Sequence, residues 1–159
     1  MLVLISWTLL ALASAKTLPH PHTNSSKVFI DGSDELGFIA IGDWGSRRDH
    51  QDEVARAMGS WCSQGSVTCD FIISTGDNIY DDGVTSVSDH HFDDTWREVY
   101  TYPGIADLPW YLTVGNHDHH SSNGEWHQVE YSLVNDRWNM PSLAFAFEMA
   151  TRDTSIKLG

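Results

Sequence analysis

From Gly37 onward, short apolar runs alternate with longer segments in which apolar residues recur with helical spacing. Apolar runs occur at 38–41, 71–75 and 109–114, and each is followed closely by glycine and then aspartate or asparagine. Such runs, bounded by turn residues, are typical of buried parallel strands. A further run at 144–148 follows Pro141 and predicts another strand, and residues 155–159 resemble the start of one more.

Three segments between these runs predict helices, at 49–61, 92–102 and 124–138. Apolar residues at helical spacing predict one buried face for the first and one for the third. These residues are Val54, Ala55, Met58 and Trp61 in the first, and Trp126, Val129, Leu133, Val134 and Trp138 in the third. Strands that alternate with helices indicate β-α-β units, a mainly parallel sheet and therefore the α/β class.

The first fifteen residues carry no charged side chain and are mostly apolar, and Ala13-Ser14-Ala15 forms a small-residue cleavage pattern. This combination predicts a secretory signal peptide over 1–15. A buried N-terminal helix and an uncleaved anchor are the alternatives. Residues 16–35 are a polar lead-in, and within it Asn24-Ser25-Ser26 is an N-glycosylation acceptor that fits secretion.

The charge balance narrows the function classes. The chain has 159 residues, enough for one domain with a single core. Lys and Arg total 9 against 22 for Asp and Glu, which gives a formal net charge of −13. A chain this acidic is a poor candidate for nucleic-acid binding or for attraction to an anionic membrane. Both interactions depend on positively charged Lys and Arg side chains that neutralise phosphate groups or anionic lipids. Carboxylates can, however, hold cations.

The chain has two cysteines, Cys62 and Cys69. In an oxidising compartment they would close a short loop over residues 63–68. The spacing is equally compatible with two buried thiols, so the sequence leaves the redox state open.

The ends of the three predicted strands carry the candidate chemistry. The segments are Gly42-Asp43-Trp44-Gly45, Gly76-Asp77-Asn78-Ile79-Tyr80 and Gly115-Asn116-His117-Asp118-His119. Because the carboxyl ends of parallel strands meet at one edge of a sheet, these side chains are expected at the same rim. Carboxylate, carboxamide, phenol and imidazole groups suit hard or borderline metal ions. One carboxylate can bridge two ions in a two-metal hydrolytic site.

The remaining histidines have no companion motif. We interpret each of them as a solvated or packed residue rather than a ligand: His20, His22, His50, His90, His91 and His127.

The three segments resemble the first three of the five motifs of purple acid phosphatases, within the calcineurin-like metallophosphoesterases. The closest form is the small tartrate-resistant type, in which the first motif reads Gly-Asp-Trp-Gly. Trp138-Asn139-Met140-Pro141-Ser142 also resembles the stretch after the third motif, so the resemblance covers 37–142. It implies a fold of two packed sheets flanked by helices, of which residues 36–159 would be the N-terminal part.

The resemblance also implies a dinuclear metal centre. Asp43 would bind Fe(III), Asp77 would bridge the two metals, and Tyr80 would bind Fe(III) as a phenolate that gives a visible colour. Asn116 would bind the second metal, which is Fe(II), Zn or Mn in the family.

The implied reaction is hydrolysis of phosphate monoesters by a secreted, lysosomal or vacuolar acid phosphatase. His117 would contact the phosphate and protonate the leaving alcohol, and Asp118 would orient neighbouring groups. The two cations would neutralise the phosphate oxygens and activate water.

The family pattern includes two later motifs that supply three more histidines. Downstream of His120 the chain has only His127, which follows the third motif too closely to match. We therefore expect the chain to be the front part of a longer phosphatase, with an incomplete fold. Two alternatives are a truncated, non-catalytic product that binds a metal or a partner, and a phosphodiesterase of the same superfamily, against which Tyr80 argues.

Overall fold

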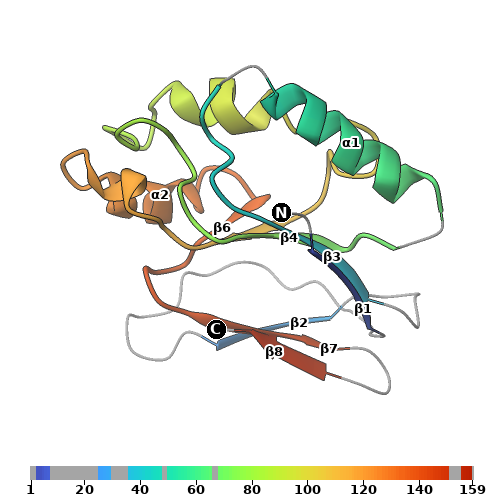
Figure 1. Cartoon of the computed structure of the whole chain (residues 1–159). Helices are drawn as coiled ribbons and strands as arrows, with labels where there is room; N and C mark the ends of the chain where they lie inside the picture. The colour runs from blue at the N-terminus through green and yellow to red at the C-terminus, as the bar shows by residue number, and fades with distance from the viewer. Residues whose placement is uncertain are drawn as a thin grey trace.

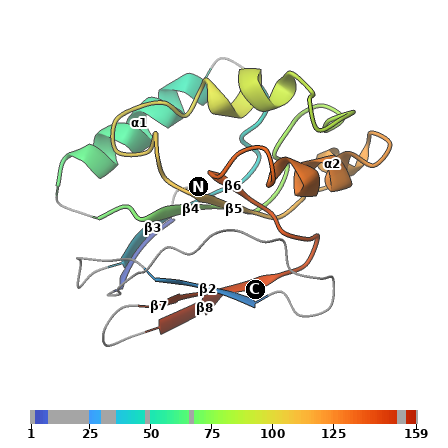
Figure 2. The same ribbon diagram turned by 180° about the vertical axis from the view of Figure 1, so that it is seen from behind.

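The computed structural model describes residues 3–7, 25–29, 36–47, 50–65, 68–150 and 155–158. They form three layers, with helices over one face of a large sheet and a small sheet against its other face (Figures 1 and 2). The large sheet has the order β1 (Val3–Trp7), β3 (Leu36–Ile41), β4 (Phe71–Ser74), β5 (Trp110–Leu112) and β6 (Trp138–Asn139). Strands β3 to β6 run parallel, and β1 pairs antiparallel with β3.

The small sheet places β7 (Ala146–Ala150) between β2 (Ser25–Phe29) and β8 (Ser155–Leu158). β2 is parallel to β7, whereas β8 is antiparallel to it. The helical segments are α1 (Gln51–Ser63), a π-helix η1 (Asp93–Arg97), a 3₁₀ turn η2 (His117–His119) and α2 (Gly124–Tyr131). The predicted α/β class and parallel sheet are therefore confirmed.

Both of the predicted buried helix faces are wrong in part. In α1, Ala55 and Met58 are buried, but Val54 and Trp61 are exposed because only one narrow side of the helix meets the sheet. The third helix ends at Tyr131 rather than at 138. Residues 132–134 form turns, so Leu133 and Val134 leave the helical repeat and face solvent, as does Trp126.

Aromatic residues fill the core between the helices and the large sheet. Trp110 of β5 lies at the centre, with ring centroids 5.1 Å from Trp44 and 4.6 Å from Tyr100. Trp96 of η1 packs edge-on against Trp138 of β6 at 5.1 Å. These side chains are all buried, and their edge-to-face contacts fix the helical layer on the sheet.

A second core lies between the two sheets. Phe71 of β4 stacks on Phe38 of β3 at 5.1 Å and meets Phe147 of β7 edge-on at 6.0 Å. Tyr111 of β5 stacks on the same Phe147 at 4.2 Å. The central strands are therefore covered on both faces, which explains why their sequences are continuous apolar runs.

The N-terminal predictions are only partly within the described residues. Val3–Trp7, inside the predicted signal peptide, form a strand rather than the helix of the alternative interpretation. The signal peptide itself stays a prediction. Asn24, His20 and His22 lie outside the described residues. Within the part of the chain that the structure describes, no helix is long and apolar enough to cross a membrane.

The two cysteines are joined by a disulfide, which resolves the alternative that the sequence left open. Cys62 lies near the end of α1, and Cys69 lies just before β4. The bond therefore ties the only helix that precedes β4 among the described residues to the start of that strand.

Candidate metal centre

The loops that follow β3, β4 and β5 lie at one edge of the sheet, and backbone hydrogen bonds join the first two of them. The Asp43 N–H donates to the Gly76 carbonyl at 3.1 Å, and the Tyr80 N–H donates to the Gly45 carbonyl at 2.9 Å. A Cβ at Gly45 would lie 1.6 Å from the Asn78 carbonyl oxygen, so only glycine permits this approach. The loops therefore meet because the strands are parallel and because glycine stands at the point of contact.

Tyr80 brings the first two loops together through its side chain. Its hydroxyl lies 3.0 Å from Asp43 Oδ1 and 2.8 Å from Asp77 Oδ2, so its single proton is shared between the two carboxylates. Asp43 and Asp77 both have left-handed backbones, with φ of 56° and 50°, a conformation that aspartate tolerates better than most residues. Desolvation, these hydrogen bonds and the two negative charges raise the pKa of the Tyr80 hydroxyl.

The third loop reaches the same carboxylate from the other side. The His117 N–H donates to Asp77 Oδ1 at 3.0 Å. A Cβ at Gly115 would lie 2.2 Å from the same oxygen, so the backbone of Asn116 runs between two residues that touch Asp77. The Asn116 side chain is exposed. We call Asp43, Asp77, Tyr80 and Asn116 the candidate metal centre.

His117 lies at the edge of this centre. Its ring centroid is 4.3 Å from that of Tyr80. Its Nδ1–H donates to the Asp81 carbonyl at 2.6 Å. This hydrogen bond fixes the orientation of the ring and does not involve Nε2. His120 contacts the same carbonyl through Nδ1 at 3.2 Å. The imidazole groups of His117 and His120 therefore lie on one side of the candidate ligand oxygens.

Asp118 is fully buried directly beneath the loops. Its carboxylate accepts hydrogen bonds from the backbone N–H groups of Asn78 and Ile79 in the second loop and of Gly115 in the third, at 2.8–3.1 Å. Gln128 of α2 donates to it at 2.9 Å. A buried carboxylate is thus satisfied by several N–H donors, and it joins two of the loops to a helix.

The network continues through Asn78, which is also fully buried. Its Nδ2 donates to the Thr113 carbonyl at 2.8 Å and to Gln128 Oε1 at 2.9 Å. Its Oδ1 accepts from the Ser74 hydroxyl, which in turn accepts from Trp44 Nε1 at 2.8 Å. The chain of contacts therefore reaches from the first loop to α2.

The comparisons with known proteins agree with this geometry. Residues 36–153 match the calcineurin-like phosphoesterases. The chain belongs to the calcineurin-like phosphoesterase family. Among its relatives, tartrate-resistant acid phosphatase type 5 of Oryctolagus cuniculus is 34% identical, and the match covers 96% of this chain and 46% of the relative. Purple acid phosphatase 7 of Arabidopsis thaliana is 40% identical, with 69% and 31% covered.

A solved structure supports the fold. The chain resembles GAP50, the anchor in the inner membrane complex of Plasmodium, with a TM-score of 0.55 and 22% identity over 76% of this chain and 39% of that one. The chain spans about half the length or less of the curated phosphatases that it matches. Calcineurin-like phosphoesterases use a dinuclear metal centre.

The donors fit such a metal centre. Two carboxylates and a phenol already lie within hydrogen-bond distance of one another, so a cation that replaced the phenolic proton would meet three oxygen ligands. The structure brings together Asp43, Asp77 and Tyr80, with Asn116 and His117 beside them. Asn78 and Gln128 were not identified from the sequence. Asn78 stands next to a predicted ligand, but nothing local to Gln128 marks it.

Proposed function

We propose that this chain is part of an acid phosphatase that hydrolyses phosphate monoesters at a centre of Fe(III) with Fe(II), Zn or Mn. The observation that carries the proposal is the Tyr80 hydroxyl, which contacts both Asp43 and Asp77. A tyrosine in this position suits a trivalent ion, because high positive charge favours the phenolate over the phenol. The similarity to tartrate-resistant and purple acid phosphatases supports the same assignment.

The residues divide between two cations. Asp43, Asp77 and Tyr80 would hold Fe(III), and Asp77 and Asn116 would hold the second ion, with Asp77 shared. When bound, the two cations supply positive charge for the phosphate oxygens and an activated water. The hydrogen bond from the His117 N–H to Asp77 Oδ1 keeps the shared carboxylate oriented.

His117 is the proposed proton donor. Its Nδ1–H is held by the Asp81 carbonyl, so Nε2 is the nitrogen that can give a proton to the leaving alcohol. The ring lies beside Tyr80, so it would be near a phosphate held by the two cations. Asp118 positions the second and third loops rather than contacting substrate, since it is buried beneath them.

The relatives are about twice as long as this chain or longer. We propose that the whole protein supplies further strands to the two sheets and three further histidine ligands beyond Gly159. We also propose that it is secreted or delivered to a lysosome or vacuole. Sequencing the transcript past the codon for Gly159 tests the first point. An authentic stop codon would favour the non-catalytic metal- or partner-binding alternative.

The ligand assignment can be tested without turnover. Titration of the chain with Fe(III) should produce a visible charge-transfer band, and Tyr80→Phe should remove it. Tyr102→Phe is the matched control, because the Tyr102 hydroxyl donates to the Asp52 carboxylate at 2.7 Å, away from the centre. A band that survives Tyr80→Phe, or that disappears with Tyr102→Phe, contradicts the assignment.

Activity is the second test. The whole protein loaded with Fe(III) and Zn should hydrolyse a phosphate monoester faster than a phosphodiester. Asp77→Asn should lower kcat by at least about 100-fold, because the shared ligand serves both cations. A preference for the diester would instead support a phosphodiesterase of the same superfamily.

A further inference from the structure

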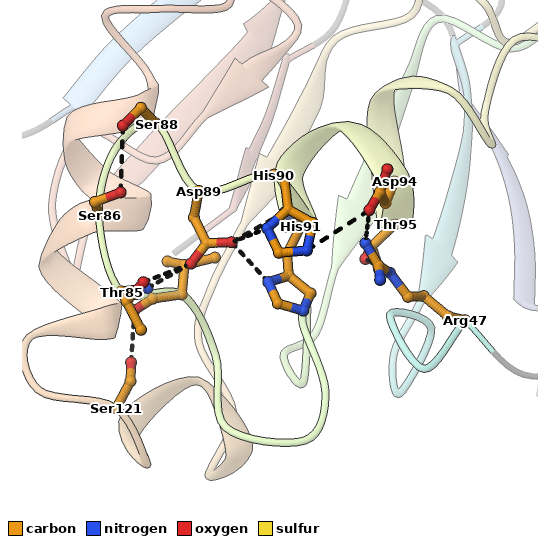
Figure 3. Close-up of polar contacts among 11 residues, drawn as sticks. Arg47, Thr85, Ser86, Ser88, Asp89, His90, His91, Asp94, Thr95 and Ser121 are labelled. Carbon is orange, nitrogen blue, oxygen red and sulfur yellow. Dashed lines mark hydrogen bonds and ion pairs between the residues drawn. The ribbon is translucent and has the colours of Figure 1, made fainter.

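A second group of ligand-type side chains lies outside the candidate metal centre, just before η1. Asp89, His90 and His91 each offer one ligand atom, and the three atoms all lie within 4.8 Å of one another. Figure 3 shows both imidazoles turned toward the same side of the Asp89 carboxylate. We call these residues the Asp-His-His cluster. The sequence pattern did not reveal it, because the two histidines matched no motif.

The Asp89 carboxylate is held in place before any cation binds. Its Oδ2 accepts hydrogen bonds from the Thr85 N–H and the Thr85 hydroxyl, both at 2.8 Å. Its Oδ1 accepts the His91 N–H at 3.0 Å. The side chain is only 6% exposed. Although burial opposes ionisation, the hydrogen bonds from His91 and Thr85 outweigh it and lower the pKa of Asp89, so the carboxylate is available as an anionic ligand.

Both imidazoles face the same carboxylate oxygen. His91 Nδ1 lies 2.6 Å from Asp89 Oδ1, and His90 Nδ1 lies 3.4 Å from it. The ring centroids of the two histidines are 4.3 Å apart. The His90 side chain is 70% exposed and that of His91 is 29% exposed, so a cation can enter from solvent.

The surroundings add no unpaired positive charge among the described neighbours. Arg47, which is drawn in Figure 3, forms an ion pair with Asp94. Asp94 Oδ2 also lies 3.8 Å from His90 Nε2. The carboxylate of Asp94 therefore offsets the charge of Arg47 beside the cluster.

Other histidines of the chain pair with carboxylates in a simpler way. His50 Nδ1 lies 3.0 Å from Glu53, and His127 Nδ1 lies 3.1 Å from Glu130, one imidazole to one carboxylate. In the Asp-His-His cluster, two imidazoles share one oxygen. One divalent cation can be bound by both rings and the carboxylate together.

We propose that Asp89, His90 and His91 form a binding site for a borderline divalent cation such as Zn²⁺, with the remaining position open to water. Two imidazole nitrogens and one carboxylate oxygen are a ligand set typical of zinc sites that keep an open position. The site is chemically distinct from the part of the candidate metal centre that this chain supplies, where the proposed ligand atoms of Asp43, Asp77, Tyr80 and Asn116 are all oxygens.

The experiment separates the two sites with a background variant. In Asp43→Asn/Asp77→Asn, isothermal titration of the full chain with Zn²⁺ should still give one equivalent bound. Adding His90→Asn and His91→Asn should weaken that binding by at least about tenfold. Removing a group that only orients a metal ligand already lowers metal affinity by about 10–100-fold, and removing the ligand itself should lower it by at least as much. The matched control adds His50→Asn and His127→Asn, which removes two histidines that each face a separate carboxylate.

Two further readouts guard against a folding artefact. Without zinc, the His90/His91 variant should unfold at the same temperature as its background, whereas added Zn²⁺ should raise the unfolding temperature of the background alone. Zinc X-ray absorption of the background should show scattering from two imidazoles. The proposal is overturned if the background binds no zinc, if the His90/His91 variant binds it as tightly, or if the scattering shows no imidazole.

Discussion

Asp118 accepts hydrogen bonds from two loops and from α2 while fully buried. Replacing it with asparagine keeps the shape but turns an amide N–H₂ toward backbone N–H groups. Hydrogen bonds to a charged acceptor contribute about 1.5–3 kcal/mol, so we expect Asp118→Asn to lower the free energy of unfolding by ~2–4 kcal/mol. Urea denaturation measures this change. Asp82→Asn, at a side chain that is 79% exposed, is the control and should be nearly neutral.

Asp70 should make stability depend on pH in the opposite sense to a typical salt-bridged carboxylate. Burial raises the pKa of Asp70, against the lowering effect of the hydrogen bond from the Gly37 N–H at 2.9 Å. The folded state therefore binds the proton more tightly than the unfolded state. The stability that Asp70 contributes is fully present below the unfolded pKa and is lost as pH rises through the folded one.

Asp70→Asn removes the charge but keeps an oxygen that can accept from the Gly37 N–H. The unfolding temperature of the variant should therefore rise relative to that of the wild type as the pH increases from about 3 to about 7. Thermal unfolding followed at several pH values checks this. A difference that shrinks as pH rises would show that the carboxylate is stabilised in the folded protein.

The residues of the candidate metal centre were predictable because they lie next to recognisable strand ends in the sequence. Asp43, Asp77 and Asn116 each follow a glycine at the end of a parallel strand, and parallel topology places such positions together. Gln128 could not be predicted, because it meets Asn78 across 50 residues and, as a polar residue, it is not part of the apolar repeat that predicts the buried face of its helix. The Asp-His-His cluster was missed for a different reason: its three residues are adjacent in the sequence, but they match no metal-binding motif.

The disulfide between Cys62 and Cys69 connects the end of α1 to the approach to β4. The two cysteines are separated by 7 positions, so the bond closes a short loop. Loop-closure entropy for this length is about 2–3 kcal/mol at room temperature. We expect Cys62→Ser/Cys69→Ser to lower the unfolding temperature by ~5–10 °C, as measured by calorimetry. A reductant should produce the same shift in the wild type and none in the variant.

The helices were the elements least well predicted. The segment 92–102 was predicted to be a helix, but η1 spans only Asp93–Arg97 and is a π-helix. Its wider turn carries Trp96 into the aromatic core, where it meets Trp110 and Trp138. Tertiary packing of a large side chain therefore accompanies the departure from a regular α-helix. Strands were predicted better, because apolar runs ended by glycine have few other interpretations.

The molecule as a whole depends on the contact between its two sheets. Phe147 is the side chain of β7 that meets both Phe71 and Tyr111. Phe147→Ala should lower the free energy of unfolding by about 3–5 kcal/mol, the usual cost of removing a buried aromatic ring. Hydrogen exchange should accelerate first in the small sheet. Trp126→Ala, at an exposed aromatic side chain, is the control and should change little.

The strand order of the small sheet could not be predicted from the sequence. β2 pairs in parallel with β7, so residues 25–29 meet residues 146–150 across most of the chain. Residues 16–35 read as a polar lead-in because the segment 25–29 has too few apolar positions to predict a strand. Pairing with a distant strand supplies the hydrogen bonds that its own composition does not indicate.

The buried contacts of Asp118, Asn78 and Gln128 hold the second and third loops against α2, and backbone hydrogen bonds hold the first loop to the second. The loops that carry the proposed metal ligands are therefore positioned before any metal ion binds. Stripping the ions with a chelator should leave a folded apoprotein with an unchanged far-ultraviolet circular dichroism spectrum, ready to be refilled with a different ion. The identity of the metal would then follow the supply in the compartment where the protein matures, and exchange would not require unfolding.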